Sequence, residues 1–401
     1  MDNWLLYILI VSAIGCGWWL GRRERAKRID SLGSGSLGAN YGRKYYQGLN
    51  YLLNEEPDRA VAAFIDDLDV NADTLETHLA LGSLLRRRGE LEKAVVVHEN
   101  ILNRAQYQKD LDVEIVHNVQ LELARDFLLA GLLDRAEELS VKLLDAGPKV
   151  KRDSLKITLE IYETEKEWQQ AIEVAKLLAV GEDSEQFDKA ISHYYCEIAE
   201  ESMAKFRNEE ARVAVSEAIG HDANSPRASL IHGQVDINEG RFDDAVRVLQ
   251  RIKNQDPVFV PESLKSLVVA YEGSERPAQE LREYLTECLE STPSISIVLV
   301  LAASIREESG DEAVAKFVAD HLKKNPTIRG LGRLIDLHID NTEGIAKENL
   351  SILRSFVEAL AADKPAYRCN KCGFEGKKMR WHCPSCKDWS TIKPIFGLEG
   401  E

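Results

Sequence analysis

The sequence predicts an all-α fold: an array of paired helices, preceded by a membrane-spanning helix and followed by a small metal-binding knuckle. Three observations lead to this prediction. An uncharged apolar segment fills residues 4–21, a polar turn followed by an alanine recurs through residues 41–362, and two C-x-x-C pairs stand between residues 369 and 386. We therefore expect an anchor over 1–21, a basic segment and tether over 22–40, the array over 41–362 and the knuckle over 363–401.

The apolar segment WLLYILIVSAIGCGWWLG has the length of a transmembrane helix. Its 18 residues rise about 27 Å as a helix, close to the hydrocarbon thickness of a bilayer. Trp4, Trp18 and Trp19 lie at its ends, where indole rings favour the membrane interface. RRERAKR follows at residues 22–28, so the positive-inside rule places the N-terminus outside and the rest in the cytoplasm. A cleaved signal peptide, or a lipoprotein signal using Cys16, would need a basic start, which this chain lacks.

The segment IDSLGSGSLGAN, residues 29–40, contains a match to the dinucleotide motif G-x-G-x-x-G. A dinucleotide site needs a strand before the glycines and a helix opening on them. Here a basic run precedes and serine and glycine dominate, so we interpret the segment as a flexible tether.

The middle of the chain repeats one pattern, a short polar turn and then a helix with an alanine near its start. A spacing near 34 residues is typical of the tetratricopeptide repeat, a helix-turn-helix unit. We therefore expect a superhelix of about eight or nine helical pairs, which is a binding architecture without chemistry of its own. The alanines are Ala60, Ala94, Ala136, Ala171, Ala211, Ala245, Ala278 and Ala313, at intervals of 34, 42, 35, 40, 34, 33 and 35 residues.

Other positions fit the same repeat. Gly48, Gly82 and Gly233 each precede one of the repeated alanines by twelve residues, where a glycine lets two helices approach. The helix that starts at Leu91 places His98 in an apolar stripe with spacing i, i+3, i+4 and i+7, which predicts a packed histidine and not a ligand. Trp168 is expected to open a second helix and to pack between repeats.

The composition limits the possible functions. A formal net charge of −16 argues against a nucleic-acid partner, because phosphate contacts need a surplus of Lys and Arg. Seven cysteines in 401 residues suit a reducing compartment better than a disulfide scaffold. Cys196 and Cys288 lie in helical stretches and are expected to be buried apolar residues. No Walker loop, H-E-x-x-H motif or nucleophile elbow is present, so we expect no enzymatic activity.

The C-terminal segment RCNKCGFEGKKMRWHCPSCKDW predicts a metal site. Cys369, Cys372, Cys383 and Cys386 form two C-x-x-C pairs with ten residues between them, a spacing that lets four thiolates surround one zinc or iron ion. Gly373 supplies the left-handed backbone that such a turn needs. A four-thiolate shell leaves no open position for substrate, which favours a structural metal and leaves no ligand role for His382.

The knuckle is also expected to dock. Trp381, Trp389, Phe374 and Ile392 give it an apolar patch, which we expect to contact the last repeat. Between residues 364 and 393, eight lysines and arginines oppose two acids, so an alternative to a solvated basic surface is docking on the acidic array or on an anionic partner.

In this arrangement the chain resembles the lipopolysaccharide assembly protein B family over essentially its whole length. The opening NWLLYILIVSAIGCGWWLGRR and the terminal YRCNKCGF and HCPSCKDWSTIKP are similar to segments of that family. Its metal ligands match Cys369, Cys372, Cys383 and Cys386, in a rubredoxin-like knuckle holding one iron or zinc ion.

The resemblance implies a non-enzymatic adaptor in the inner membrane of Gram-negative bacteria, with a periplasmic N-terminus and a cytoplasmic array. It implies that the chain promotes degradation of the UDP-acyl-GlcNAc deacetylase, the enzyme that commits material to lipid A, by a membrane AAA+ protease. It further implies an inner-membrane signalling protein that acts through the transmembrane segment, and contacts with lipopolysaccharide assembly proteins. Self-association, through the anchor or through surfaces like that at Gly82, is left open.

Two alternatives remain. A scaffold for lipopolysaccharide assembly would form the same complexes without affecting proteolysis. A redox protein would use iron in the knuckle for electron transfer.

Overall fold

The computed structural model describes residues 75–105, 113–180 and 184–401, together with scattered residues between 48 and 63. The predicted anchor and tether lie outside the described residues. Among the residues that are described, no helix is long and apolar enough to cross a membrane. The described residues divide into two compact units, one that ends at residue 161 and one that begins at residue 162.

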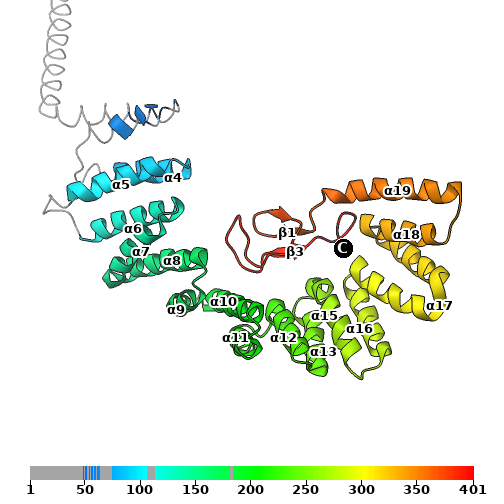
Figure 1. Cartoon of the computed structure of the whole chain (residues 1–401). Helices are drawn as coiled ribbons and strands as arrows, with labels where there is room; N and C mark the ends of the chain where they lie inside the picture. The colour runs from blue at the N-terminus through cyan, green and yellow to red at the C-terminus, as the bar shows by residue number, and fades with distance from the viewer. Residues whose placement is uncertain are drawn as a thin grey trace, which may run out of the picture. The chain divides into compact units, whose positions relative to one another are not determined.

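The helices follow one another in pairs, as predicted for a tetratricopeptide array (Figure 1). The helices that lie in the first unit are α4 (Leu75–Arg87), α5 (Leu91–Ala105), α6 (Val113–Leu129) and α7 (Leu133–Lys142), then the 3₁₀ turn η2 (Leu143–Asp145) and the start of α8 (Pro148–Glu165).

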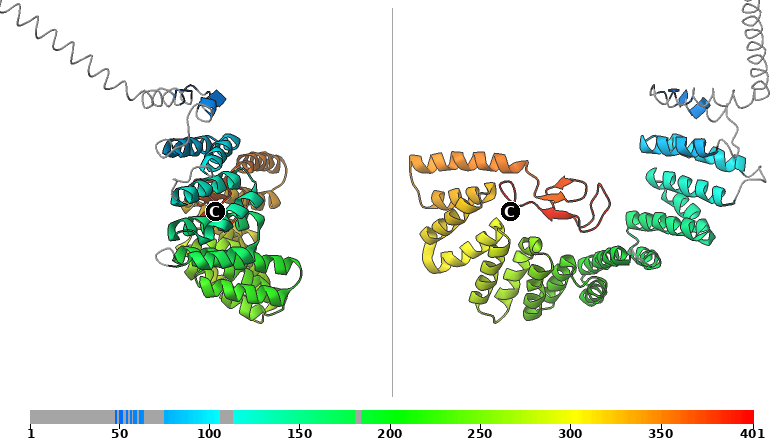
Figure 2. Two further views of the ribbon diagram at one scale, coloured as in Figure 1. Left: turned by 90° about the vertical axis from the view of Figure 1, so that its left-hand side faces the viewer. Right: turned by 180° about the vertical axis from the view of Figure 1, so that it is seen from behind.

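The second unit carries the remaining pairs and the knuckle (Figure 2). Its helices are α9 (Trp168–Leu178), α10 (Ser184–Ala204), α11 (Asn208–His221), α12 (Pro226–Asn238), α13 (Phe242–Gln250), α14 (Ile252–Gln255), the 3₁₀ turn η3 (Pro257–Phe259), α15 (Val260–Gly273), α16 (Ala278–Ser291), α17 (Ile295–Lys324), α18 (Ile328–Asp340) and α19 (Ile345–Ala362).

A glycine divides α17 into the two helices of one pair. Gly310 has φ 78° and ψ −179°, a conformation open only to glycine, and it interrupts the helix. Val298 and Ala302 before it and Val314 and Val318 after it belong to one buried cluster. The turn that the sequence predicts at ESGDEA is therefore confirmed, although Val314 and not Ala313 is the buried residue after it.

Five turns between paired helices share one backbone structure. A residue with positive φ ends the first helix, and the next N–H donates back to a carbonyl five residues earlier, as Glu90 does to Leu85 at 3.0 Å. The buried alanine of the second helix follows the positive-φ residue by five positions. The positive-φ residues are Gly89, Gly131, Lys166, Phe206 and Gly240, and the alanines are Ala94, Ala136, Ala171, Ala211 and Ala245.

The α15–α16 turn departs from this structure, and one sequence prediction is wrong there. Ala278 is the first residue of α16 and is exposed. The fourth residue of α16, which corresponds by position to Ala94 in α5 and Ala245 in α13, is Leu281. The turn of residues 274–277 contains no residue with positive φ.

The close helix approach predicted at Gly82 and Gly233 is confirmed. A Cβ at Gly82 would lie 2.4 Å from His98 Nε2, and one at Gly233 would lie 2.5 Å from Leu249 Cγ. His98 is buried, as predicted, and its Nδ1 contacts the carboxylate of Asp126. Gly82 is buried inside its own pair, so it is not exposed as a surface for self-association.

The knuckle is a three-stranded antiparallel sheet of order β2-β1-β3. Tyr367 pairs with Gly376 on one side and with Pro394 on the other, and Cys369 pairs with Ile392. The strands are β1 (Tyr367–Cys369), β2 (Glu375–Gly376) and β3 (Ile392–Pro394).

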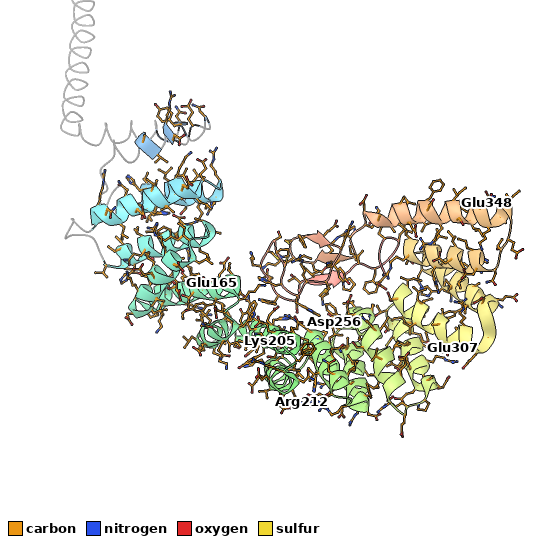
Figure 3. The ribbon with its side chains drawn as sticks, in the orientation of Figure 1. Glu165, Lys205, Arg212, Asp256, Glu307 and Glu348 are labelled. Atoms are coloured by element: carbon orange, nitrogen blue, oxygen red, sulfur yellow. The ribbon has the colours of Figure 1, made fainter. Side chains whose placement is uncertain are left out.

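Two of the left-handed turn positions are not glycine, which gives a test of the turn structure. They are Lys166 and Phe206, which follow Glu165 and Lys205, the residues labelled in Figure 3. Because a side chain in this region costs about 1–2 kcal/mol, we expect Phe206→Gly to raise the free energy of unfolding by up to about 1 kcal/mol, part of the gain being offset by the flexibility of glycine in the unfolded chain. Phe206 is 93% exposed, so little packing is lost.

Urea denaturation of the purified chain measures this effect, and Gly131→Ala is the matched control. Gly131 has φ 75° and no atom within 4 Å of its missing Cβ, so the alanine is strained without a clash. We expect that variant to lose about 1 kcal/mol. A loss of stability in Phe206→Gly would contradict the backbone argument.

Candidate metal centre

The two C-x-x-C turns have the same backbone structure. The Gly373 N–H donates to the Cys369 carbonyl at 3.0 Å, and the Lys387 N–H donates to the Cys383 carbonyl at 2.9 Å. The residue after each pair is left-handed, with φ 78° at Gly373 and 59° at Lys387. The prediction for Gly373 is confirmed, whereas Lys387 was not singled out because a lysine gives no sequence signal for this conformation.

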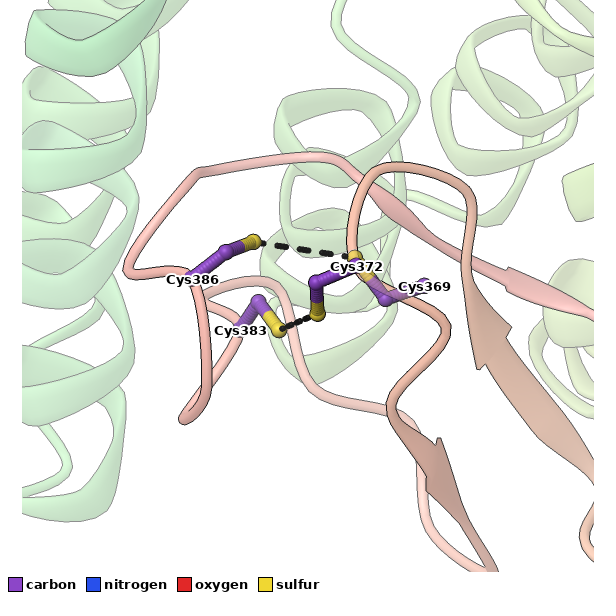
Figure 4. A group of neighbouring side chains, drawn as sticks. All are labelled: Cys369, Cys372, Cys383 and Cys386. Carbon is purple, nitrogen blue, oxygen red and sulfur yellow. Dashed lines mark hydrogen bonds between the residues drawn. The ribbon is translucent and has the colours of Figure 1, made fainter.

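These turns bring the four predicted cysteine sulfurs together (Figure 4). Cys369 Sγ lies 3.7 Å from Cys386 Sγ, and Cys372 Sγ lies 3.6 Å from Cys383 Sγ. All four sulfurs lie within 4.8 Å of one another. Four sulfurs about 2.3 Å from a tetrahedral ion would be about 3.8 Å apart, so the cluster fits a zinc or iron ion.

The surroundings of the cluster favour thiolates at two positions. The backbone N–H of Phe374 lowers the pKa of Cys372. Burial opposes ionisation of Cys369, but hydrogen bonding by Thr391 and nearby backbone N–H groups outweighs it and lowers the pKa of Cys369 to about 6. Burial raises the pKa of Cys386 to about 12. Metal binding would take up the thiolates of all four residues and hold the two turns together.

The knuckle has few apolar residues of its own. Cys369, Cys383 and Ile392 form its buried core, with Phe374 and Met379 packed around them. A core of this size does not hold a fold by itself, so a structural metal would supply much of the stability. His382 takes no part in the cluster, as predicted, because its Nε2 lies 2.7 Å from the Lys387 carbonyl and its ring stacks on Trp389.

The aromatic side chains of the knuckle dock on the second unit, on helices α9 and α10 and on the turn η3. The Trp381 ring lies 4.9 Å from the Phe259 ring in η3. Trp389 stacks on His193 of α10 at 4.9 Å and meets Trp168 of α9 edge to face at 6.2 Å. The prediction of an aromatic docking patch is therefore confirmed for the two tryptophans, but the expectation that they contact the last repeat is wrong.

Hydrogen bonds and an ion pair surround these rings. Trp389 Nε1 donates to Glu163 at 2.8 Å, and the Tyr367 hydroxyl donates to Glu262 at 2.7 Å. Lys393 forms an ion pair with Asp256. The three acceptors are carboxylates of the array. Of the eight basic residues, Lys393 alone pairs with an array carboxylate among the described residues, so docking on the acidic array is confirmed for that one ion pair.

The arginine Arg227 lies at the centre of the docking surface and is 2% exposed. Its guanidinium donates to Glu197 at 2.7 Å and to Glu200 at 3.0 Å, both on α10. Its Cζ lies 5.9 Å from the Trp381 ring and 5.8 Å from the Trp389 ring. Because the knuckle covers a charged group, docking excludes water from the guanidinium and adds cation–π contacts, while the carboxylates of Glu197 and Glu200 stay partly exposed.

Burial also fixes the charge state of the neighbouring histidine. Burial, with the nearby Arg227 charge, lowers the pKa of His193 to about 3, so this side chain is neutral near pH 7. Its Nε2 lies 2.7 Å from the Ser390 hydroxyl of the knuckle. A protonated His193 would repel the Arg227 guanidinium. The neutral imidazole avoids this repulsion and stacks on Trp389.

The last residue of the chain makes a further contact with the array. Ser294 and Ser296 donate their hydroxyls to the Glu401 carboxylate, both at 2.8 Å. Arg329 also binds this carboxylate. The Ile328 N–H donates to the Leu398 carbonyl at 2.9 Å, so the segment after the knuckle joins the starts of α17 and α18.

The sequence identified the four cysteines and the two docking tryptophans but missed their partners. Arg227, His193 and Glu163 stand in ordinary helical positions, and a single sequence holds no signal that pairs them with residues about 160 to 230 positions away. Cys196 and Cys288 are buried, as predicted. Trp168 opens α9, as predicted, and packs on Tyr194 as well as on the knuckle.

Comparisons with known proteins agree with this architecture. A family model described as "Rubredoxin metal binding domain" matches residues 367–394. The chain is 36% identical to lipopolysaccharide assembly protein B of Escherichia coli (strain K12), covering 99% of each chain. It is 30% identical to the protein of the same name from Haemophilus influenzae, covering 98% of this chain and 99% of the other.

Solved structures give weaker matches. MamA protein is 16% identical, with a TM-score of 0.33 over 48% of this chain and 98% of its own. A tetratricopeptide repeat protein from Parabacteroides merdae is 13% identical, with a TM-score of 0.34 over 66% of this chain and 99% of its own.

Metal removal gives a direct test of the centre. We expect Cys369→Ser with Cys372→Ser to lose the bound metal and to make the knuckle sensitive to trypsin, while the helical circular dichroism is retained. The physical reason is that the small core depends on the ion, whereas the helices have their own buried clusters. Elemental analysis and timed proteolysis measure both effects.

The matched control is Cys288→Ser, which changes a buried cysteine outside the cluster. It should retain about one metal ion per chain and an intact knuckle. Full metal content in the double variant would refute the assigned ligand set.

A second test concerns docking apart from metal binding. We expect Arg227→Met to lower the free energy of unfolding by about 1–2 kcal/mol, because its hydrogen bonds to two carboxylates and its cation–π contacts are lost. Trypsin should then cut the knuckle faster although the metal content stays at about one ion per chain. Arg207→Met is the control, since Arg207 is exposed and, among the described residues, forms an ion pair with Glu210 alone, one helical turn away. Equal proteolysis of the two variants would show that Arg227 does not hold the knuckle.

Proposed function

We propose, on the premise that this chain belongs to the lipopolysaccharide assembly protein B family, that it is an adaptor that limits lipopolysaccharide synthesis. In this proposal the array and knuckle bind the UDP-acyl-GlcNAc deacetylase of lipid A synthesis and present it to a membrane AAA+ protease. The apolar segment at residues 4–21 holds the chain in the inner membrane with its array in the cytoplasm. An inner-membrane signalling protein restrains the adaptor through that segment, and lipopolysaccharide assembly proteins contact it as well.

The observation that carries the proposal is the full-length match to relatives named for lipopolysaccharide assembly. The match includes the anchor segment, the array and the knuckle, because it covers 99% of the chain. A function that depends on the combination of these parts is favoured over one that any single part could supply.

The chemistry of the chain supports a binding role. Within the described residues, the only cluster of cysteine, histidine or acidic side chains suited to a metal is the four-cysteine site. Four thiolates complete a tetrahedral shell and leave no position for a substrate. The docked knuckle enlarges the surface that the second unit offers to a partner, and its metal holds that surface in one shape.

Anchoring would add to the effect of binding. A protein confined to the membrane meets a membrane protease at a raised effective concentration, without any additional contact. The serine- and glycine-rich segment at residues 29–40 would then give the array reach from the membrane surface.

Two other functions are distinguished by simple measurements. A scaffold for lipopolysaccharide assembly fits the same relatives and would use the same binding surfaces, but it leaves the lifetime of the deacetylase unchanged. Electron transfer needs an iron-loaded knuckle with reversible reduction, so a chain that is active with zinc excludes it.

The half-life of the deacetylase in cells depleted of this protein tests the proposal. We expect the half-life to lengthen several-fold, because the protease loses the adaptor that delivers its substrate. Re-expression of the wild-type chain or of Cys288→Ser should restore rapid degradation, and Cys369→Ser with Cys372→Ser should not. An unchanged half-life after depletion would rule out the adaptor role and favour the scaffold.

A further inference from the structure

A cavity between α15, α16 and α17 forms a second surface feature, apart from the metal centre. Its volume is about 570 Å³, within the range of about 300–1,000 Å³ that is typical of ligand pockets. Its apolar lining comes from all three helices and includes Val268, Leu281, Leu285, Leu299, Val300 and Ala303.

The sequence explains why the cavity lies at this pair of helices. In five other pairs a fully buried alanine stands near the start of the second helix, so the two helices pack closely. Here Leu281 occupies the fourth position of α16 and points its larger side chain into the cavity lining. The α15–α16 turn also lacks the left-handed residue that closes the other five turns. A larger side chain and a different turn both separate the helices, which leaves an apolar gap.

The charges at the rim select the kind of ligand. Arg276 is already paired with Asp243 and Glu280, and Arg282 is paired with Glu308. The carboxylates of Glu272 and Glu307 also line the cavity, and both residues are exposed. Among the described residues, neither carboxylate has a hydrogen bond or an ion pair. Besides Glu308, Glu307, which is labelled on α17 in Figure 3, also attracts the Arg282 guanidinium and helps to raise its pKa. Counting the paired groups, five carboxylates and two guanidiniums lie at the rim, so its net charge is negative.

We infer that this cavity binds a basic peptide segment of a partner protein, with one or two large apolar side chains in the cavity and flanking Lys or Arg side chains on Glu272 and Glu307. The apolar lining supplies affinity by removing the anchor side chains from water. The rim carboxylates supply orientation and exclude acidic segments. An anionic lipid or a fatty acid is disfavoured because its head group would face a rim of net negative charge.

This inference does not rest on the proposed role in proteolysis. The cavity lies apart from the docking surface of the knuckle, whose contacts are with Glu163, His193, Arg227, Asp256, Phe259 and Glu262. Peptide binding can therefore be measured whether or not the chain acts with a protease.

The test uses the full chain purified in detergent and a fluorescein-labelled synthetic peptide, Gly-Ser-Lys-Arg-Leu-Trp-Lys-Arg-Ser-Gly. We expect saturable binding by fluorescence anisotropy that weakens as salt is added. Two comparison peptides separate the apolar contribution to binding from the charge contribution. One has Ser-Ser in place of Leu-Trp, and the other has Glu in place of every Lys and Arg. Both should bind at least tenfold more weakly.

Variants of the chain locate the site. Glu272→Lys with Glu307→Lys should weaken the basic peptide about threefold to tenfold, which is the effect of losing two exposed ion pairs. Ala303→Phe should weaken it at least tenfold by filling the cavity. Glu290→Lys reverses an exposed charge on α16 outside the cavity lining and should bind like the wild type.

Each other outcome overturns the inference. The inference is wrong if the basic peptide does not bind or if the acidic peptide binds equally well. It is also wrong if neither the double rim variant nor Ala303→Phe changes the binding. Saturable binding of lauric acid in place of the peptide would assign the cavity to a lipid. Thermal unfolding by circular dichroism checks each variant, and the double rim variant changes only exposed residues, so the test stands even if Ala303→Phe does not fold.

Discussion

The burial of Arg227 is the constraint on which the second unit depends. A buried guanidinium must be paired, and Glu197 and Glu200 of α10 supply the pairing from one side. The other side is covered by Trp381 and Trp389 of the knuckle. The metal centre holds those tryptophans in place, since Trp381 precedes Cys383 by two residues and Trp389 follows Cys386 by three. Metal loading, docking and the satisfaction of a buried charge are therefore parts of one interaction.

Through its contacts with the array the knuckle has a structural role in spite of its small size. The four-thiolate site would stabilise a segment that has almost no core, and the docked segment then joins helices that lie far apart in the sequence. Trp389 contacts α9 and α10, Lys393 contacts Asp256, and the Glu401 carboxylate receives hydrogen bonds from Ser294 and Ser296. An array whose repeats contact only their neighbours is easily bent, and contacts from one segment to several repeats oppose such bending.

The repeats themselves are regular where they pack and irregular where they leave space. Alanine in the second helix and a left-handed residue in the turn recur in five pairs, and each of those alanines is fully buried. The α15–α16 pair has neither feature, and the cavity described above lies there. The five regular pairs pack closely. The α15–α16 pair packs less closely, and its cavity is the place where we infer that a partner side chain enters.

The sequence by itself determined the class of fold and the metal ligands, because both depend on local spacing. A repeat of about 34 residues fixes a helical pair, and two C-x-x-C turns followed by Gly373 and Lys387 bring four sulfurs together within one short segment. The tertiary structure alone decided where the knuckle docks, because Trp389 meets Glu163 and His193 across more than 190 residues of chain. It also decided that Leu281 and not Ala278 holds the packing position in α16, because the helix start depends on how the turn closes. Spacing along the chain encodes local geometry. Which of the acidic helices the knuckle contacts is decided by burial and charge pairing in three dimensions.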